Sequence, residues 1–208
     1  MRLSLCNEVL ADFDFEHQCQ YASALGYDGL EVAPYTLTAD PRTLTEKKLL
    51  GYKAMAGDAG IAITSLHWLL LAPKGLSIVD PDSAIRNRTF DLMHRLIDQC
   101  ALLGGSVLVH GSPGQRRLER DGDRERAEAF FAAAGERAER AGVTYCIEPL
   151  ARRETNFINT LFEAVELVRA LNRTGLKTML DTSAAANTET DTPARLLETW
   201  LPSGLIAH

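Results

Sequence analysis

The chain has 208 residues, of which 46% are hydrophobic and 24% are charged. These values are ordinary for a globular protein and exclude a disordered polymer or a fibre. A chain of this length can bury roughly 70% of its unfolded surface, so we expect one domain over residues 1–208. The longest apolar run, 68–72, is far shorter than the ~20 residues that cross a bilayer, and residues 1–16 lack the pattern of a signal peptide. We therefore expect no membrane association.

The formal net charge of -6 argues against a nucleic-acid partner, because nucleic-acid binding usually requires a basic surface. One segment is locally basic, but its arginines alternate with acids, which predicts a solvated loop and helix start. These arginines are Arg116, Arg117, Arg120, Arg124 and Arg126. The four cysteines are scattered without the spacing of a disulfide framework or a zinc ribbon, so we expect a cytoplasmic protein. They are Cys6, Cys19, Cys100 and Cys146.

Short runs rich in Val, Ile and Leu alternate with longer stretches of helical periodicity, the pattern of a parallel sheet covered by helices. The predicted elements, in chain order, are strand 2–9, helix 15–25, strand 29–34, helix 45–59, strand 61–70, helix 83–103, strand 106–112, helix 124–140, strand 143–150, helix 160–171, strand 176–182, helix 193–201 and the start of a seventh strand at 205–208. Thr45 and Thr192 are predicted N-caps.

The repeating unit is about 32 residues, close to the unit of an eight-fold TIM barrel. A doubly wound open sheet is the competing architecture, but no glycine-rich phosphate-binding motif follows any predicted strand. We therefore expect an α/β protein of the (β/α)8 barrel type. Counted against about 250 residues for a closed barrel, the chain is expected to be truncated after about six and a half units.

Polar or ionisable residues stand late in almost every predicted strand, where a strand of a parallel sheet is normally apolar. They are Asn7, Glu8, Glu31, His67, His110, Glu148, Asp181 and His208. In a barrel these strand ends face one another at the carboxyl-terminal mouth, where active sites of this fold lie. Carboxylates and imidazoles there could bind Mg²⁺, Mn²⁺ or a similar divalent ion. No thiolate is among these residues, which argues against a structural zinc ion.

At these residues the sequence resembles the xylose isomerase-like TIM barrels, which include ketose 3-epimerases, hydroxypyruvate isomerases and inosose dehydratases. The resemblance covers the whole chain. The motifs that carry it are GYDGLEVAP (26–34), SLHW (65–68), VLVHGSP (107–113), IEPLARRETNFINT (147–160) and MLDTSAA (179–185). Of these, IEPL to TNFINT and LDT are the more specific.

The resemblance implies that Glu148 and Asp181 bind a divalent metal ion, Mn²⁺, Mg²⁺ or Co²⁺ in preference to Zn²⁺. It implies that Glu148 also removes a proton next to a carbonyl through an enediolate. His208 is a further expected ligand, at the place where the family carries an H-x-H stretch at the end of strand seven; if His208 is the first histidine of that stretch, the ligand itself would be two residues further on. Substrate contacts are expected from Asn7, Glu31, His67, Trp68, His110 and Glu154. Asn156 and Asn159 belong to the same region and could equally serve as turn or cap residues.

Two departures from the family pattern matter. The ketose epimerases carry a histidine three residues beyond the strand-six aspartate, where this chain has Ala184. A contact with a substrate hydroxyl or phosphate is therefore lost or supplied otherwise. The family's metal histidine and its last glutamate lie on strands seven and eight, and here His208 is the last residue.

We expect a metal-dependent sugar, sugar-acid or sugar-phosphate isomerase or epimerase, acting on a small molecule and associating into dimers or tetramers. A dehydratase on the same scaffold is an open alternative, since it begins with the same proton abstraction. An inactive barrel fragment is another. An abasic-site endonuclease of this fold is a third, but it needs the histidine replaced by Ala184 and a DNA-binding surface that a charge of -6 disfavours.

Overall fold

A parallel sheet forms the centre of the molecule. The computed structural model describes residues 2–208 and contains six strands within them. These are β1 (Ser4–Cys6), β2 (Gly29–Val32), β3 (Ala62–Leu66), β4 (Val107–His110), β5 (Thr144–Ile147) and β6 (Leu176–Thr178). Each strand pairs in parallel with the next one along the chain, in the order β1-β2-β3-β4-β5-β6. A doubly wound sheet reverses direction at a switch point, so this uninterrupted order is that of a barrel.

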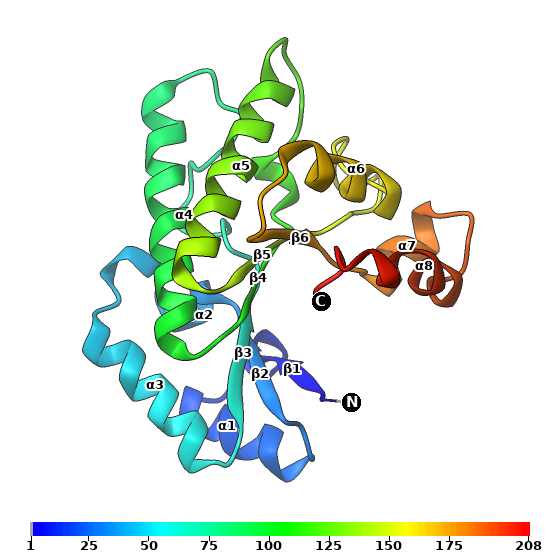
Figure 1. Cartoon of the computed structure of the whole chain (residues 1–208). Coiled ribbons are helices and arrows are strands. Elements are labelled where there is room, and N and C mark those ends of the chain that lie inside the picture. The colour runs from blue at the N-terminus through cyan, green and yellow to red at the C-terminus, as the bar shows by residue number, and fades with distance from the viewer. Residues whose placement is uncertain (1) are drawn as a thin grey trace.

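Helices connect consecutive strands and cover the outer side of the sheet, as Figure 1 shows for α3, α4 and α5. The helices of the described residues are α1 (Phe15–Ala24), α2 (Pro34–Leu37), α3 (Glu46–Asp58), α4 (Ser83–Leu103), α5 (Asp123–Ala141), α6 (Leu161–Leu171), α7 (Thr182–Thr188) and α8 (Pro193–Trp200). None of the helices within residues 2–208 has both the length and the apolar character needed to cross a membrane.

Helix termini follow the capping signals in the sequence. Thr45 and Thr192 are N-caps, as predicted, of α3 and α8. Thr160 begins α6 with a capping box, in which its side chain accepts a bond from the Glu163 amide while the Glu163 carboxylate accepts one from the Thr160 amide. Gly104 ends α4 in the left-handed conformation with φ 89°. The predicted helix 83–103 is therefore confirmed at both ends.

Side chains of the sheet alternate between two apolar layers. On β4, Leu108 packs in the large cluster between sheet and helices, while Val107 and Val109 belong to a small cluster on the opposite face with Cys146 and Met179. This alternation follows from the two-residue period of a strand. Burial on both faces explains why the strands read as continuous apolar runs.

The strands are shorter than predicted, because the polar residues at their ends turn out of the sheet. Residues Asn7–Leu10 form a 3₁₀ turn after β1, and the strand predicted over 61–70 ends at Leu66. Trp68, with φ 51°, reverses the chain there. Residues 205–208 lie beside β6, where Thr178 bonds to Leu205 and Ala207 and forms a single parallel bridge with Ile206. The short helices α2 and α7 were not predicted.

One close backbone approach holds α5 against the start of β6. A Cβ added at Gly175 would collide with the backbone oxygen of Gly135 and lie 2.5 Å from the Glu139 amide nitrogen. We predict that Gly175→Ala lowers the free energy of unfolding by about 1–3 kcal/mol, as overpacking does in well-packed cores. Urea denaturation measures this change.

The matched control is Gly57→Ala, also a glycine-to-alanine change but inside α3. Within the described chain no atom lies within 4 Å of a Cβ at Gly57. This variant should unfold at equal or higher urea concentration, because alanine favours helix by up to about 1 kcal/mol. Equal stabilities for the two variants would contradict the packing account.

Candidate functional site

A cavity of about 260 Å³ lies at the carboxyl ends of the strands. Its lining comes from all six strand ends and from the last residue. The lining residues are Cys6, Glu31, His67, Trp68, Val109, Gly111, Ser112, Pro113, Glu148, Leu150, Glu154, Met179, Asp181 and His208. A larger hollow of about 670 Å³ lies on the outer surface between α3 and α4. We place the site in the smaller cavity, because it collects titratable side chains from separate strands.

The structure brings together seven of the nine residues predicted from the sequence. These are Glu31, His67, Trp68, Glu148, Glu154, Asp181 and His208. The juxtaposition follows from the parallel sheet, which aligns every strand in the same direction.

The other two residues lie away from the cavity lining. Asn7 is fully buried and joins the 3₁₀ turn after β1 to the next unit, because its amide donates to Thr36 and its oxygen accepts from the Ala33 amide. His110 is fully buried against Phe130 and Phe131 of α5, with Nδ1 2.7 Å from the hydroxyl of Tyr145. Burial lowers the pKa of His110 well below its usual value, which keeps the imidazole neutral. We therefore assign both to the support of the site.

Glu148 follows β5 and is held against β4. A Cβ at Gly111 would collide with Oε2 of Glu148, so a larger residue there would displace the end of this side chain. Burial, reinforced by the nearby charge of Asp181, raises the pKa of Glu148 to about 7. Glu148 is thus a desolvated carboxylate beside other acids, the environment in which functional acids and bases are found.

Asp181 is fixed by a helix that the sequence analysis missed. Its Oδ1 accepts bonds from the amides of Ser183 at 2.7 Å and Ala184 at 3.2 Å, which makes it the N-cap of α7. A capping aspartate has a defined orientation, and one of its oxygens is occupied by the helix. Ala184 itself is buried in α7.

Glu31 connects the opposite wall of the cavity to His208. Nε2 of His208 lies 3.2 Å from Oε1 of Glu31. Burial alone would raise the pKa of Glu31, but the contact with His208 and the proximity of His67 outweigh it and lower the pKa to about 2. The same contact with Glu31 raises the pKa of His208. Glu31 is therefore ionised throughout the neutral range.

Arg116 corrects a prediction from the sequence. The arginine segment was predicted to be solvated, yet Arg116 is fully buried. Its guanidinium donates to the backbone oxygens of Glu148 at 2.6 Å and His110 at 3.4 Å. Burial lowers the pKa of Arg116 to about 10, so the group stays charged at neutral pH. It joins the ends of β4 and β5, which single-sequence periodicity could not reveal.

The donor set of the cavity suits a divalent cation. Four carboxylates line it, those of Glu31, Glu148, Glu154 and Asp181. The charges of the other three add to the effect of burial in raising the pKa of Glu148. Oε1 of Glu31 is buried and lies 3.2 Å from Nε2 of His208, but among residues 2–208 it accepts no hydrogen bond of good geometry. Buried carboxylates at close range are normally paired or ligate metals. Glu148, Asp181 and His208 are the residues that could hold the ion.

Comparison with known sequences gives one family. A family described as Xylose isomerase-like TIM barrel matches residues 19–202. The chain is 31% identical over 173 residues to a protein named D-psicose 3-epimerase from Ruminiclostridium cellulolyticum. That match covers 81% of this chain and 57% of the relative. The chain therefore spans little more than half the length of the curated relatives it matches.

Comparison with solved structures gives the same fold. A crystal structure of D-psicose 3-epimerase in the presence of D-fructose superposes with a TM-score of 0.82 at 21% identity, covering 100% of this chain and 72% of that one. A structure of 3-keto-D-glucoside 4-epimerase from E. coli gives the same score and identity, with 77% of that chain covered.

The raised pKa of Glu148 predicts a pH-dependent stability. Its pKa of about 7 lies above the ordinary 4.5, so the ionised form destabilises the metal-free fold above pH 7, and this penalty disappears as the pH falls toward 4.5. Glu148→Gln should therefore be more stable than the parent by about 1–3 kcal/mol at pH 8 and equal to it near pH 4.5. Urea unfolding with a chelator measures the difference.

Glu139→Gln is the matched control, since Glu139 is an exposed glutamate on α5. Its stability should follow that of the parent at both pH values. A Glu148→Gln variant that is less stable than the parent at pH 8 would contradict the assigned environment.

Proposed function

The chain belongs to the xylose isomerase-like TIM barrel family, and from that premise we propose that it acts as a metal-dependent sugar isomerase or epimerase. The observation that carries the proposal is the cavity in which Glu148 and Asp181 lie together at the carboxyl ends of β5 and β6. The relatives named D-psicose 3-epimerase support a ketose as the substrate class. Because the chain spans only part of their length, the activity of the whole protein is included in the proposal.

Glu148, Asp181 and His208 would hold a divalent ion, Mn²⁺, Mg²⁺ or Co²⁺. When bound, such an ion stabilises negative charge on neighbouring oxygens and so acidifies the carbon between them. The free oxygen of Asp181 and the carboxylate of Glu148 supply hard oxygen donors, which these ions prefer. The acids lining the cavity also need a positive charge to offset their mutual repulsion.

Glu148 is proposed to take the proton from the carbon next to the sugar carbonyl. Its burial makes the carboxylate a stronger base than one in water, because desolvation disfavours the charged form. The close approach of its Oε2 to Gly111 places the carboxylate beside the end of β4. A positioned base loses little entropy in the reaction, which is a main source of enzymatic rate.

Trp68 and Glu154 are proposed to bind the sugar, with Glu31 and His67 in the wall beside them. Trp68 is 40% exposed although it is large and apolar, and the positive φ of 51° at this residue turns it out of the strand. An exposed aromatic face in a polar cavity suits the apolar face of a sugar ring. Oε2 of Glu154 accepts a bond from the Ala151 amide at 3.1 Å, which fixes its carboxylate at the rim.

Because Ala184 replaces the histidine of the ketose epimerases, the proposal does not specify which sugar is the substrate. The methyl side chain of Ala184 is buried in α7 and cannot hydrogen-bond to a substrate hydroxyl or phosphate. A cytoplasmic location and a homo-oligomeric state remain part of the proposal. Four free cysteines in the described chain support the location.

We predict that the parent with Mn²⁺ exchanges the proton next to the carbonyl of D-psicose for deuterium, followed by NMR in deuterated water. Glu148→Gln should lose this exchange by at least about 100-fold while keeping its fold, because the amide cannot accept the proton. Glu139→Gln, a conservative change outside the cavity, should keep the parental rate.

Exchange at the parental rate in Glu148→Gln would overturn the assignment of the base. The same spectra separate an epimerase from a dehydratase, because a dehydratase loses water and gives an unsaturated product.

A further inference from the structure

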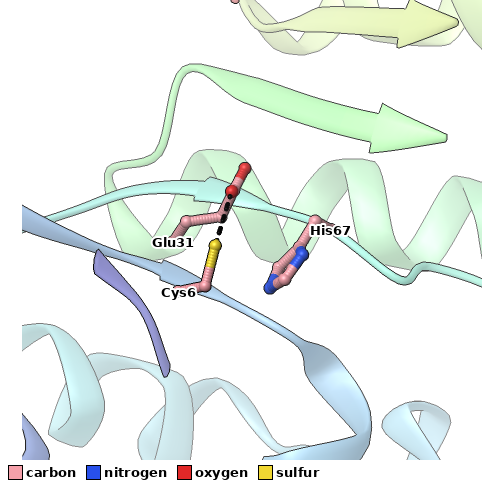
Figure 2. A group of neighbouring side chains, drawn as sticks. All are labelled: Cys6, Glu31 and His67. Atoms are coloured by element: carbon pink, nitrogen blue, oxygen red, sulfur yellow. Dashed lines mark hydrogen bonds between the residues drawn. The ribbon is translucent and has the colours of Figure 1, made fainter. Parts of the chain in front are cut away.

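Three side chains on neighbouring strands meet at one wall of the cavity. Cys6 ends β1, Glu31 lies on β2, and His67 follows β3, and Figure 2 shows all three directed into the same space. One ligand atom from each lies within 4.8 Å of the other two. Cys6 is not among the site residues predicted from the sequence. Its proximity to Glu31 depends on the pairing of β1 with β2, in which Cys6 and Glu31 are register partners.

The polar atoms of this cluster are poorly satisfied. Glu31 and His67 are each only 8% exposed. Within the described part of the chain, neither Oε1 of Glu31 nor Nε2 of His67 makes a hydrogen bond of good geometry, although Oε1 of Glu31 lies 3.2 Å from Nε2 of His208. The Cys6 thiol donates to Oε2 of Glu31 at 3.4 Å, a weak bond. Buried polar atoms without partners are costly, so such a group calls for a ligand.

The charge around the cluster is also unbalanced. Oε2 of Glu8 lies 2.9 Å from Nε2 of His67, but its direction is wrong for a hydrogen bond, and among residues 2–208 this oxygen has no partner either. Glu8 and Glu31 therefore bring two carboxylates to one thiol and to the imidazoles of His67 and His208. A cation placed among them would be bound by oxygen, nitrogen and sulfur donors from three separate strands.

We infer that Cys6, Glu31 and His67 form a second cation site, which takes a divalent ion of the Zn²⁺ and Co²⁺ class. A set of sulfur, nitrogen and oxygen donors suits these borderline ions and is poorly suited to Mg²⁺. On binding, the S–H bond of Cys6 breaks, the sulfur electron pair bonds to the cation, and the proton passes to solvent. Glu8 lies beside the site and adds negative charge.

The second site takes its ligands from β1 to β3, whereas the ion proposed for catalysis is held by Glu148 and Asp181 beyond β5 and β6. Glu31 and His67 also belong to the wall of the cavity proposed for the sugar, so the two sites adjoin. His208 contacts Glu31 and so lies between the two groups. The sulfur ligand gives the second site a spectroscopic signal that the first cannot produce.

The test is titration of the metal-free chain with Co²⁺ in the absence of oxygen. A thiolate bound to Co²⁺ gives a charge-transfer band in the near ultraviolet, whose final intensity we expect to correspond to one thiolate-bound ion per chain. Cys6→Ser should lose the band. His67→Gln should weaken Co²⁺ binding about 10–100-fold, as loss of a supporting group does at metal sites.

Two variants act as controls. Cys19→Ala changes a cysteine that is buried in α1 outside the cavity, and it should keep the band. Asp181→Asn alters the site proposed for catalysis, and it should also keep the band. The band surviving in Cys6→Ser, or its absence from the parent, would overturn the second site while leaving the proposed reaction intact. Loss of the band in Asp181→Asn would overturn its independence.

A second measurement uses the unaltered chain, in case Cys6→Ser fails to fold. Bound Co²⁺ should slow alkylation of Cys6 by iodoacetamide several-fold, followed by mass spectrometry, because the metal occupies the sulfur. An unchanged alkylation rate at saturating Co²⁺ would contradict the site.

Discussion

The parallel hydrogen bonding of the sheet is the constraint on which the site depends. Because β1 to β6 run in one direction and in chain order, residues separated by whole βα units end at the same edge. Glu31 and Asp181 lie 150 positions apart in the sequence, yet both line one cavity. The helices and the apolar clusters hold this edge in place. The direction of the strands therefore determines which side chains meet in the cavity.

Buried negative charge is the second organising feature. Burial raises the pKa of Glu148 to about 7, whereas contacts with His208 and His67 lower that of Glu31 to about 2. The two carboxylates share a cavity but have different neighbours, and this difference shifts their pKa values in opposite directions. The Arg116 guanidinium donates a hydrogen bond to the backbone oxygen of Glu148 and not to the Glu148 carboxylate. The negative charge of the carboxylates that line the cavity favours the binding of cations there.

Local signals in the sequence predicted the long elements well, since periodicity and caps such as Thr45 and Thr192 act within one segment. The strand ends were harder to predict, because a polar residue after an apolar run reads the same whether it continues the strand or turns out of it. His110 and Arg116 are buried through contacts with β5 that periodicity cannot report. Cys6 was missed for the same reason, since its partner Glu31 is reached only across the sheet.

The central claim is that Glu148 and Asp181 form one cation site at the carboxyl ends of the strands. Anomalous diffraction from a crystal soaked with Mn²⁺ and a ketose tests it most directly. We expect an anomalous peak within bonding distance of a carboxylate oxygen of each residue, about 2.0–2.3 Å away. Saturating Mn²⁺ with no peak between the two carboxylates, or with peaks only on the outer surface, would contradict the account.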